Sequence, residues 1–310
     1  MNKLGILGIA AIAAVAVPSL ASAKTIGVAM ASLDAYKTLL ANGIKSRGES
    51  LGLTVRVENA DKDSDRQIAA LKDFVKSGVD AIIVNPVNGD RGVEISKIAT
   101  DAGIPLIYVN SEPINVDRLP PKQAFVASKE AEAGTLEAKQ VCQDLGGKGK
   151  VAVMMGELLH PAARRRTEYT LKTLQSDGCK GIQVIEQQSA NWSRDEGAEL
   201  MREWLAAGER PDAIISNNDE MALGAIRSLK EAGIDMSRVK VAGVDATKDA
   251  LAAMKRGDMA VTVFQNAAGQ ASAAVDAAMK FAGGEDVPSK IYVPFELVTP
   301  ANVAQYAGKN

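Results

Sequence analysis

Residues 214–226, Ile-Ile-Ser-Asn-Asn-Asp-Glu-Met-Ala-Leu-Gly-Ala-Ile, pass from an apolar run through amides and acids into a second apolar pattern. The run that begins at Ala213 predicts a short buried strand, and the apolar residues after position 220 predict one face of a helix. Asn217, Asn218 and Asp219 therefore lie at the carboxyl end of a strand, where open α/β sheets bind ligands. Asn and Asp are also preferred helix N-caps, so this stretch alone leaves both capping and ligand binding open.

The alternation of strand and helix extends in both directions from this stretch. Strands are predicted at residues 25–31, 54–58, 81–84, 105–109, 124–127, 150–155, 182–187, 213–216, 239–244, 261–264 and 291–297. Helices are predicted at residues 36–50, 64–77, 92–102, 129–145, 162–176, 194–207, 220–232, 248–255 and 266–281. Alternating units of this length are typical of parallel sheets with helices on both faces. The predicted fold class is therefore α/β, with two doubly wound parallel sheets.

The start of the chain has the pattern of an export signal. Residues 1–23 contain Lys3 as their only charge, an apolar run from Leu4 to Val17 and the small-residue end Ala21-Ser22-Ala23. This pattern predicts a secretory signal peptide that is cleaved after Ala23. The apolar run is shorter than the roughly 20 residues that a membrane span needs. We therefore expect an exported protein, located in a bacterial periplasm.

Length and composition limit the possible functions. Removing residues 1–23 leaves 287 residues, above the roughly 250 at which single cores stop growing, so two lobes are expected. The full chain has 36 basic and 38 acidic residues; without Lys3 the balance is 35 to 38, a charge of −3 that argues against a nucleic-acid surface. One His and two Cys exclude His-rich and Cys-rich metal sites, and we predict no metal and no cofactor.

The residues that follow the predicted strands are polar. They include carboxylates, amides, an Arg and two aromatic side chains, in residues 32–37, 85–86, 110–112, 157–166, 191–193, 217–219, 245–247 and 265–266. Carboxylates and amides bind hydroxyl groups, Arg donates in a planar fork, and aromatic rings cover apolar C–H faces. These residues suit a small polyhydroxylated molecule. The chain has no Walker loop and no Gly-x-Ser-x-Gly elbow, so no enzyme is predicted.

Five segments carry a resemblance to a known family: residues 83–86, 162–166, 218–225, 243–245 and 262–265. In this order they resemble the periplasmic substrate-binding proteins of ABC sugar importers, in the ribose- and inositol-binding branch of type I, over essentially the whole mature chain. The resemblance implies two lobes joined by three hinge crossings, an N-terminal lobe of residues 24–128 plus 266–294 and a C-terminal lobe of residues 129–265 plus 295–310. It also implies a monomer that closes on a monosaccharide, cyclitol or polyol and delivers it to a membrane permease.

The resemblance, carried over position by position, also implies a set of ligand-binding residues: Asp34, Tyr36, Asn85, Asn110, Arg166, Trp192, Asn218, Asp245 and Gln265. Two departures argue against ribose. Asn110-Ser111 stands where ribose binders have an Asp-Arg pair, and Lys37 replaces a second aromatic residue in the first loop. Residues 294–300, Pro-Phe-Glu-Leu-Val-Thr-Pro, are similar to those of inositol and polyol binders. An inositol-like ligand is therefore favoured over ribose.

The same residues also bear on other functions. Sugar-sensing repressors share this fold, but they carry a helix-turn-helix where this chain has its export signal. A secreted enzyme on the same fold would need an activated nucleophile or an acid–base pair. His160 is the only histidine, and we expect it to act as a helix cap or surface residue, with a ligand contact as the alternative. A chemotaxis or signalling role for a sugar-like ligand could coexist with transport.

The two cysteines, Cys142 and Cys179, form a possible disulfide. An even number of cysteines in an exported protein favours a bridge. Each follows or ends a predicted helix of the second lobe, and both helices end on the edge of the sheet away from the ligand cleft. Their Cα atoms could therefore lie within the roughly 4.4–6.8 Å that a disulfide requires. The alternative is a pair of separate small apolar side chains.

Overall fold

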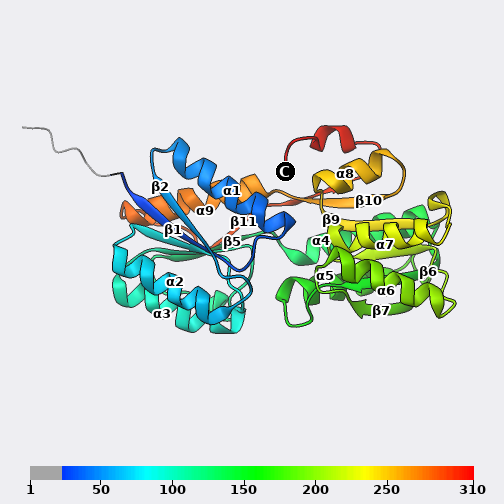
Figure 1. Cartoon of the computed structure of the whole chain (residues 1–310), viewed down its shortest axis with the longest axis horizontal. Helices are drawn as coiled ribbons and strands as arrows, with labels where there is room; N and C mark the ends of the chain where they lie inside the picture. Colours follow the sequence, from blue (N-terminus) through cyan, green and yellow to red (C-terminus); the bar gives the residue numbers. More distant parts are fainter. Residues whose placement is uncertain (1–22) are drawn as a thin grey trace, which may run out of the picture.

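The computed structural model describes residues 23–310, so the signal-peptide prediction lies almost entirely outside the described residues. These residues fold into two α/β lobes, each built around a six-stranded sheet. Figure 1 shows the lobes side by side, with the first two helices of the chain in one lobe and α5, α6 and α7 in the other. The predicted fold class, two lobes with doubly wound parallel sheets, is confirmed.

The sheet of the first lobe has the order β11-β5-β4-β3-β1-β2, and all of its neighbouring strands are parallel. Its strands are β1 (Thr25–Met30), β2 (Thr54–Asn59), β3 (Ala81–Val84), β4 (Leu106–Val109), β5 (Gln123–Ala127) and β11 (Lys290–Tyr292). Its helices are α1 (Ala35–Ser50), α2 (Ser64–Ser77), α3 (Gly92–Ala102) and α9 (Ala267–Ala282), with 3₁₀ turns η1 (Gly89–Arg91) and η2 (Val116–Arg118).

The sheet of the second lobe has the order β12-β10-β9-β8-β6-β7, and only its edge strand β12 is antiparallel to its neighbour. Its strands are β6 (Lys148–Met155), β7 (Gly181–Ser189), β8 (Ala213–Ser216), β9 (Lys240–Asp245), β10 (Val261–Gln265) and β12 (Phe295–Val298). Its helices are α4 (Glu130–Asp144), α5 (Pro161–Leu174), α6 (Arg194–Ala206), α7 (Asp219–Glu231) and α8 (Lys248–Lys255), with 3₁₀ turns η3 (Met236–Arg238) and η4 (Val303–Tyr306).

Both sheets are covered by helices on both faces, which explains why central strands such as β3 and β4 are short apolar runs. In the first lobe, α1 and α9 pack on one face and α2 and α3 on the other. In the second lobe, α6, α7 and α8 cover one face, while α4 and α5 cover the other. The four residues of β3 and the four of β4 are all buried. The helices thus leave open the carboxyl ends of the strands, which face the other lobe.

The chain passes between the two sheets three times: after β5, after β10 and between β11 and β12. The sequence predicted a single strand over residues 291–297, and this prediction is wrong. Residues 290–292 pair with β5 in the first sheet, and residues 295–298 pair with β10 in the second. Pro294 lies between the two strands and has no N–H to donate to a ladder, so it suits the crossing. The exact lobe boundaries stay a prediction.

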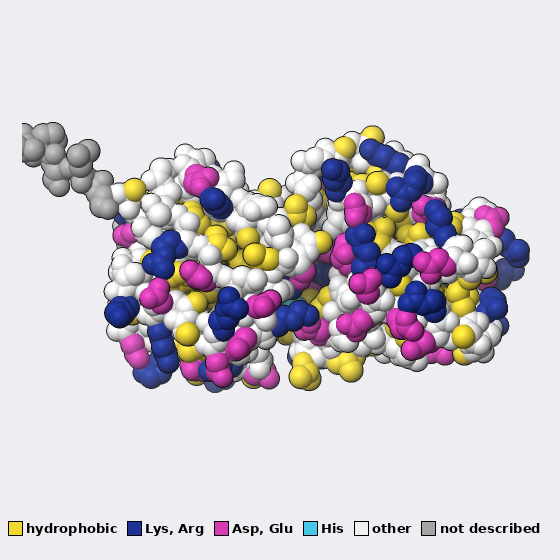
Figure 2. Space-filling model, viewed as in Figure 1, with side chains coloured by type: hydrophobic (Ala, Val, Ile, Leu, Met, Phe, Trp, Pro, Cys, Tyr) yellow, Lys and Arg dark blue, Asp and Glu magenta, His cyan; other side chains and the backbone are white. Residues whose placement is uncertain are grey.

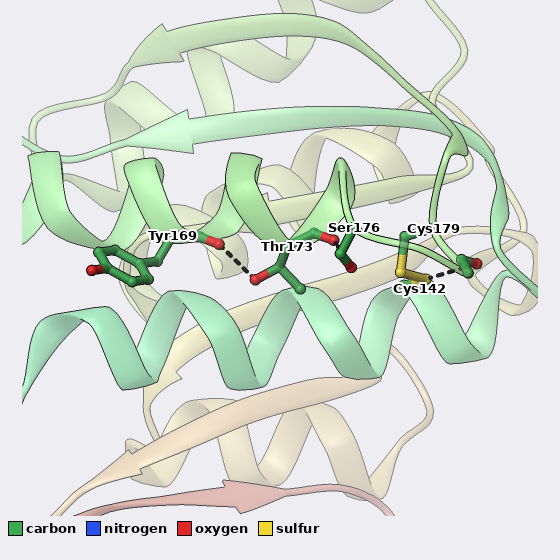
Figure 3. Close-up of a disulfide and its surroundings, with 6 residues drawn as sticks. Cys142, Tyr169, Thr173, Ser176 and Cys179 are labelled. Atoms are coloured by element: carbon green, nitrogen blue, oxygen red, sulfur yellow. Dashed lines mark hydrogen bonds between the residues drawn. A yellow bond between two sulfur atoms is a disulfide. The ribbon is translucent and has the colours of Figure 1, made fainter.

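Helices α4 and α5 lie side by side, and a disulfide joins Cys142, near the end of α4, to Cys179, in the turn after α5 (Figure 3). The two Cα atoms are 5.7 Å apart, within the range that the sequence-based argument required. The same two helices approach closely at Gly134, where a Cβ would lie 2.2 Å from the carbonyl O of Arg166. A glycine is therefore needed at this point of the interface. Of the helices in residues 23–310, none combines the length and apolar character needed to cross a membrane.

Candidate ligand-binding cleft

A cavity lies between the two lobes, at the carboxyl ends of both sheets. Figure 2 shows the surface notched between the lobes, with acidic and basic side chains interspersed on either side. The cavity contains about 420 Å³ of space not filled by atoms, including the part open to solvent. We call it the cleft; it is lined by Asp34, Tyr36, Lys37, Asn110, Glu130, His160, Ala162, Arg166, Trp192, Asn218, Asp245 and Gln265. Eight of the nine residues implied by the resemblance thus lie in one place.

Two of the eight predicted residues in the cleft cap helices that begin there. Asp34 is the N-cap of α1 and accepts a hydrogen bond from the backbone N of Lys37 at 2.9 Å; it also forms an ion pair with the Lys37 ammonium. Asn218 is the N-cap of α7 and accepts from the backbone N of Met221 at 3.1 Å. Capping and lining the cleft are therefore compatible, because each cap uses only part of the hydrogen-bonding capacity of its side chain.

Three cleft residues have a backbone conformation that side chains rarely adopt. The φ angles of Asn110, Trp192 and Asp245 are +65°, +64° and +121°. Such conformations cost roughly 1–3 kcal/mol each and concentrate at functional sites. They turn the side chains at the carboxyl ends of β4, β7 and β9 into the space between the lobes. The sequence marks these three positions by their place after predicted strands and by the family resemblance, and neither signal predicts the backbone conformation.

The strained segment after β9 is held by Asp219, which is fully buried in the first turn of α7. Its carboxylate accepts from the backbone N of Thr247 at 2.8 Å and from the Thr262 hydroxyl at 2.7 Å. The same hydroxyl accepts from the backbone N of Ala246 at 3.1 Å. Burial raises the pKa of Asp219 to about 7, and the hydrogen bonds that it accepts oppose this shift. Asp219 thus holds the backbone of residues 246–247, directly after Asp245, in place.

Arg166 connects the parts of the second lobe that meet at the cleft. Its Nε donates to Glu130 Oε2 at 2.6 Å, and its Nη1 donates to the carbonyl O of Asn217 at 2.6 Å. Its Nη2 donates to Gln265 Oε1 at 3.2 Å. The guanidinium also lies 5.8 Å from the ring centre of Trp192. Arg166 therefore joins α4, the end of β8 and the end of β10, and it is almost completely buried while doing so.

Several polar groups in the cleft have no protein partner. The Tyr36 hydroxyl and the Gln265 Nε2 are buried without a hydrogen bond among the described residues. Within residues 23–310, no hydrogen bond reaches the carboxylate of Asp245 either, although this residue is only 4% exposed. Buried polar groups are rarely left unpaired, because each unpaired group costs free energy. The Gln265 Nε2, the Asp245 carboxylate and the Tyr36 hydroxyl therefore indicate that a polar ligand binds between the lobes.

The electrostatics of the cleft follow from its burial. Burial raises the pKa of the Asp245 carboxyl well above its usual value, against the lowering effect of Arg166. Burial also raises the pKa of the Tyr36 hydroxyl, with a further contribution from Asp245. Two of the three cleft carboxylates are paired, Asp34 with Lys37 and Glu130 with Arg166. Asp245 is the carboxylate left to accept hydrogen bonds from a ligand.

Asn85 is the one predicted ligand-binding residue that does not line the cleft. It is 0% exposed, and its Nδ2 donates to the carbonyl O of Val109 at 3.1 Å and to the Ser111 hydroxyl at 3.0 Å. Asn85 thus lies behind the first-lobe wall and holds it in place. The reason is geometric: β3 is a central strand, and its end is covered by the chain that follows β4.

Four cleft residues were not in the predicted set: Lys37, Glu130, His160 and Ala162. Lys37 was noted only as a departure from the family pattern, and His160 had a ligand contact only as its alternative role. His160 does cap α5, since its Nδ1 accepts from the backbone N of Ala162 at 3.2 Å. Glu130 had no signal in the sequence beyond its place in a predicted helix. Within the part of the chain that the structure describes, no group of three His, Cys, Asp or Glu side chains could hold a metal ion.

Comparisons with known proteins agree with this geometry. A family model described as a periplasmic binding protein domain matches residues 26–286. A protein of Rhizobium meliloti assigned as rhizopine-binding is 52% identical over 296 residues, covering 95% of this chain and 96% of the relative. The ribose import binding protein of Haemophilus influenzae is 30% identical over 301 residues, covering 96% and 100%. A solved ABC transporter solute binding protein from Bacillus halodurans, with bound myo-inositol, is 41% identical with a TM-score of 0.85, covering 93% and 98%.

Proposed function

The chain belongs to the family of periplasmic binding protein domains, and we propose that it captures a cyclitol, monosaccharide or polyol in the cleft and delivers it to the permease of an ABC importer. The proposal includes an inositol-like ligand in preference to ribose. It also includes action as a monomer in the periplasm after cleavage behind Ala23.

The observation that carries this proposal is the set of unpartnered polar groups between the lobes. The Asp245 carboxylate, the Gln265 Nε2 and the Tyr36 hydroxyl together offer acceptors and donors to hydroxyl groups. Trp192 lines the same cavity and can cover an apolar ring face. A ring that carries a hydroxyl group on every carbon would present both kinds of surface.

The preference for an inositol-like ligand is supported by the order of identities among the relatives. The solved protein with bound myo-inositol is 41% identical to this chain, whereas the ribose import protein is 30% identical. The cleft agrees with this order, since Asn110-Ser111 replaces the Asp-Arg pair expected for ribose. Delivery to a permease follows from the family of ABC transporter solute binding proteins to which the solved relative belongs.

Replacing Asp245 with Ala tests the site. A hydrogen bond to a charged group contributes roughly 1.5–3 kcal/mol, so Asp245→Ala should weaken binding by about tenfold to a hundredfold. Calorimetric titration with myo-inositol, ribose and xylitol measures this change, using the compound that binds the unchanged protein most tightly. Asp249→Ala is the matched control, because the Asp249 side chain is 60% exposed on α8 and outside the cleft. Equal affinities of the Asp245→Ala variant and the unchanged protein would contradict the assignment.

A further inference from the structure

The side-chain amide of Asn310 joins three backbone groups where the two lobes meet. Its Nδ2 donates to the carbonyl O of Asp245 at 2.7 Å and to the carbonyl O of Gln265 at 2.9 Å. Its Oδ1 accepts from the backbone N of Ala267 at 3.2 Å. Asp245 ends β9 and Gln265 ends β10, both in the second lobe, whereas Ala267 begins α9 in the first lobe. One amide therefore contacts both lobes and the chain that passes between them.

The segment that carries Asn310 is anchored beside Gln265. Tyr306, in η4, is buried, and its ring centre lies 5.2 Å from that of Phe264, the residue before Gln265. Gly308 has a φ angle of +77°, a conformation that glycine adopts without steric cost, and it lies in the turn that leads to Asn310. Figure 1 shows the end of the chain, marked C, between the two lobes. Packing of this segment therefore sets the position of Asn310.

The bonds to Gln265 and Ala267 restrain the chain crossing after β10. These two residues flank Asn266, which is the single residue between β10 and α9. The amide of Asn310 binds the carbonyl O before Asn266 and the N–H after it, so the backbone angles of Asn266 cannot change far without breaking one of these bonds. Hinge movements need φ and ψ changes in a few such residues. Asn310 therefore holds this crossing in the arrangement that the structure shows.

The other bond of Asn310 reaches a strained residue of the cleft. Asp245 has a φ angle of +121°, and its carboxylate lines the cleft beside the side chain of Gln265. Asp219 holds the backbone just after Asp245, as described above, and Asn310 holds the Asp245 carbonyl O. Asn310 does not line the cleft itself. It can therefore affect a ligand only through the residues whose backbone it binds.

We propose that Asn310 is a positioning residue for ligand binding: it keeps Asp245 and Gln265 oriented toward the ligand and links their backbone to the crossing at Asn266. This inference rests on the proposed function, because Asp245 and Gln265 are the ligand contacts assigned there. Without the amide, the cleft spends a smaller fraction of time in the binding arrangement. The apparent affinity falls with that fraction, although no contact to the ligand is removed.

The test compares ligand affinity with stability in two matched variants. Asn310→Ala should bind the ligand about tenfold more weakly, which is the size of effect that one hydrogen bond can have. Asn302→Ala is the control, because Asn302 also joins two backbone groups: it accepts from the Thr299 N at 2.8 Å and donates to the Leu297 O at 3.0 Å, outside the cleft. Both variants should lower the melting temperature, and only Asn310→Ala should lower the affinity.

A third variant separates the donated bonds of Asn310 from the accepted one. Asn310→Asp keeps an acceptor for the N–H of Ala267, but it brings a negative charge against the carbonyl oxygens of Asp245 and Gln265. It should therefore bind the ligand at least as weakly as Asn310→Ala. Calorimetric titration measures the affinities at a temperature at which all variants remain folded. The probe is myo-inositol, ribose or xylitol, whichever binds the unchanged protein most tightly.

The outcomes separate the two proposals. No binding of myo-inositol, ribose or xylitol to the unchanged protein would overturn the proposed function and this inference with it. Binding by the unchanged protein and equal affinity in Asn310→Ala would overturn the inference alone. An equal loss of affinity in Asn302→Ala would also overturn it, because the loss would then come from general destabilisation. Full affinity in Asn310→Asp would do the same, since the two donated bonds would then be unnecessary.

Discussion

Replacing Arg166 with Met is expected to lower the free energy of unfolding by about 3–5 kcal/mol and to abolish measurable ligand binding. Removing one partner of a buried ion pair leaves the other charge uncompensated, and such changes cost this much. Here the Glu130 carboxylate would lose its partner, and the carbonyl O of Asn217 would lose its donor. Gln265 would lose the bond that orients its amide in the cleft. Urea denaturation and calorimetric titration measure the two effects.

A neighbouring arginine provides the control for this change. Arg165 lies on the same helix, but its side chain is 61% exposed and pairs with Glu168 on the surface. Arg165→Met should change the free energy of unfolding by less than about 1 kcal/mol. Arg166→Lys keeps the charge but lacks the planar fork, so it should recover only part of the loss. Similar unfolding free energies for the two methionine variants would contradict the account of Arg166.

Removing the disulfide is expected to lower the free energy of unfolding by about 3–4 kcal/mol while leaving ligand affinity within about twofold. The bridge closes a loop of 37 residues, and the chain-entropy model gives this magnitude for such a loop. Cys142 lies 12 residues along α4 from Glu130, or about 18 Å at the helical rise. Figure 3 shows the bridge at the end of the paired helices. The double variant Cys142→Ser, Cys179→Ser isolates its contribution.

Reductant provides the matched control for the bridge. It should destabilise the unchanged protein by about as much as the double substitution, and it should have no effect on the double variant. Labelling of thiols in the denatured, unreduced protein checks the bridge itself. Two reactive thiols, or a loss of ligand affinity that equals the loss of stability, would contradict this part of the account.

Most of the fold could be predicted because its signals are local. The strands β3, β4 and β8 are short apolar runs, and polar residues mark their ends, so their positions follow from the sequence alone. The break between β11 and β12 could not be predicted from local signals. Residues 291–297 read as one strand, and only the family resemblance placed a crossing between residues 294 and 295. Pairing with two different sheets divides the segment.

The cleft residues at strand ends could be predicted from the sequence. A residue that lies in the cleft only because two helices pack together could not. Asp245, Asn110 and Trp192 lie at or just after the carboxyl ends of strands, and the fold directs all such residues to one edge. Glu130 faces the cleft because α4 packs beside α5, and it was missed since nothing local marks that contact. Asn85 also follows a strand, but the chain after β4 covers it. A prediction based on strand ends therefore places Asn85 in the cleft, whereas it lies buried behind the cleft wall.

The most direct test of the central claim is a thermal-shift screen of cyclitols, pentoses, hexoses and polyols against the mature chain. A ligand that binds only the folded state raises the melting temperature, and the stabilisation grows with the logarithm of the ligand concentration divided by its dissociation constant. We expect a cyclitol such as myo-inositol to give a larger shift than ribose, and Asp245→Ala to reduce that shift. A screen in which no sugar, cyclitol or polyol shifts the melting temperature of the unchanged protein would contradict the assignment of the cleft.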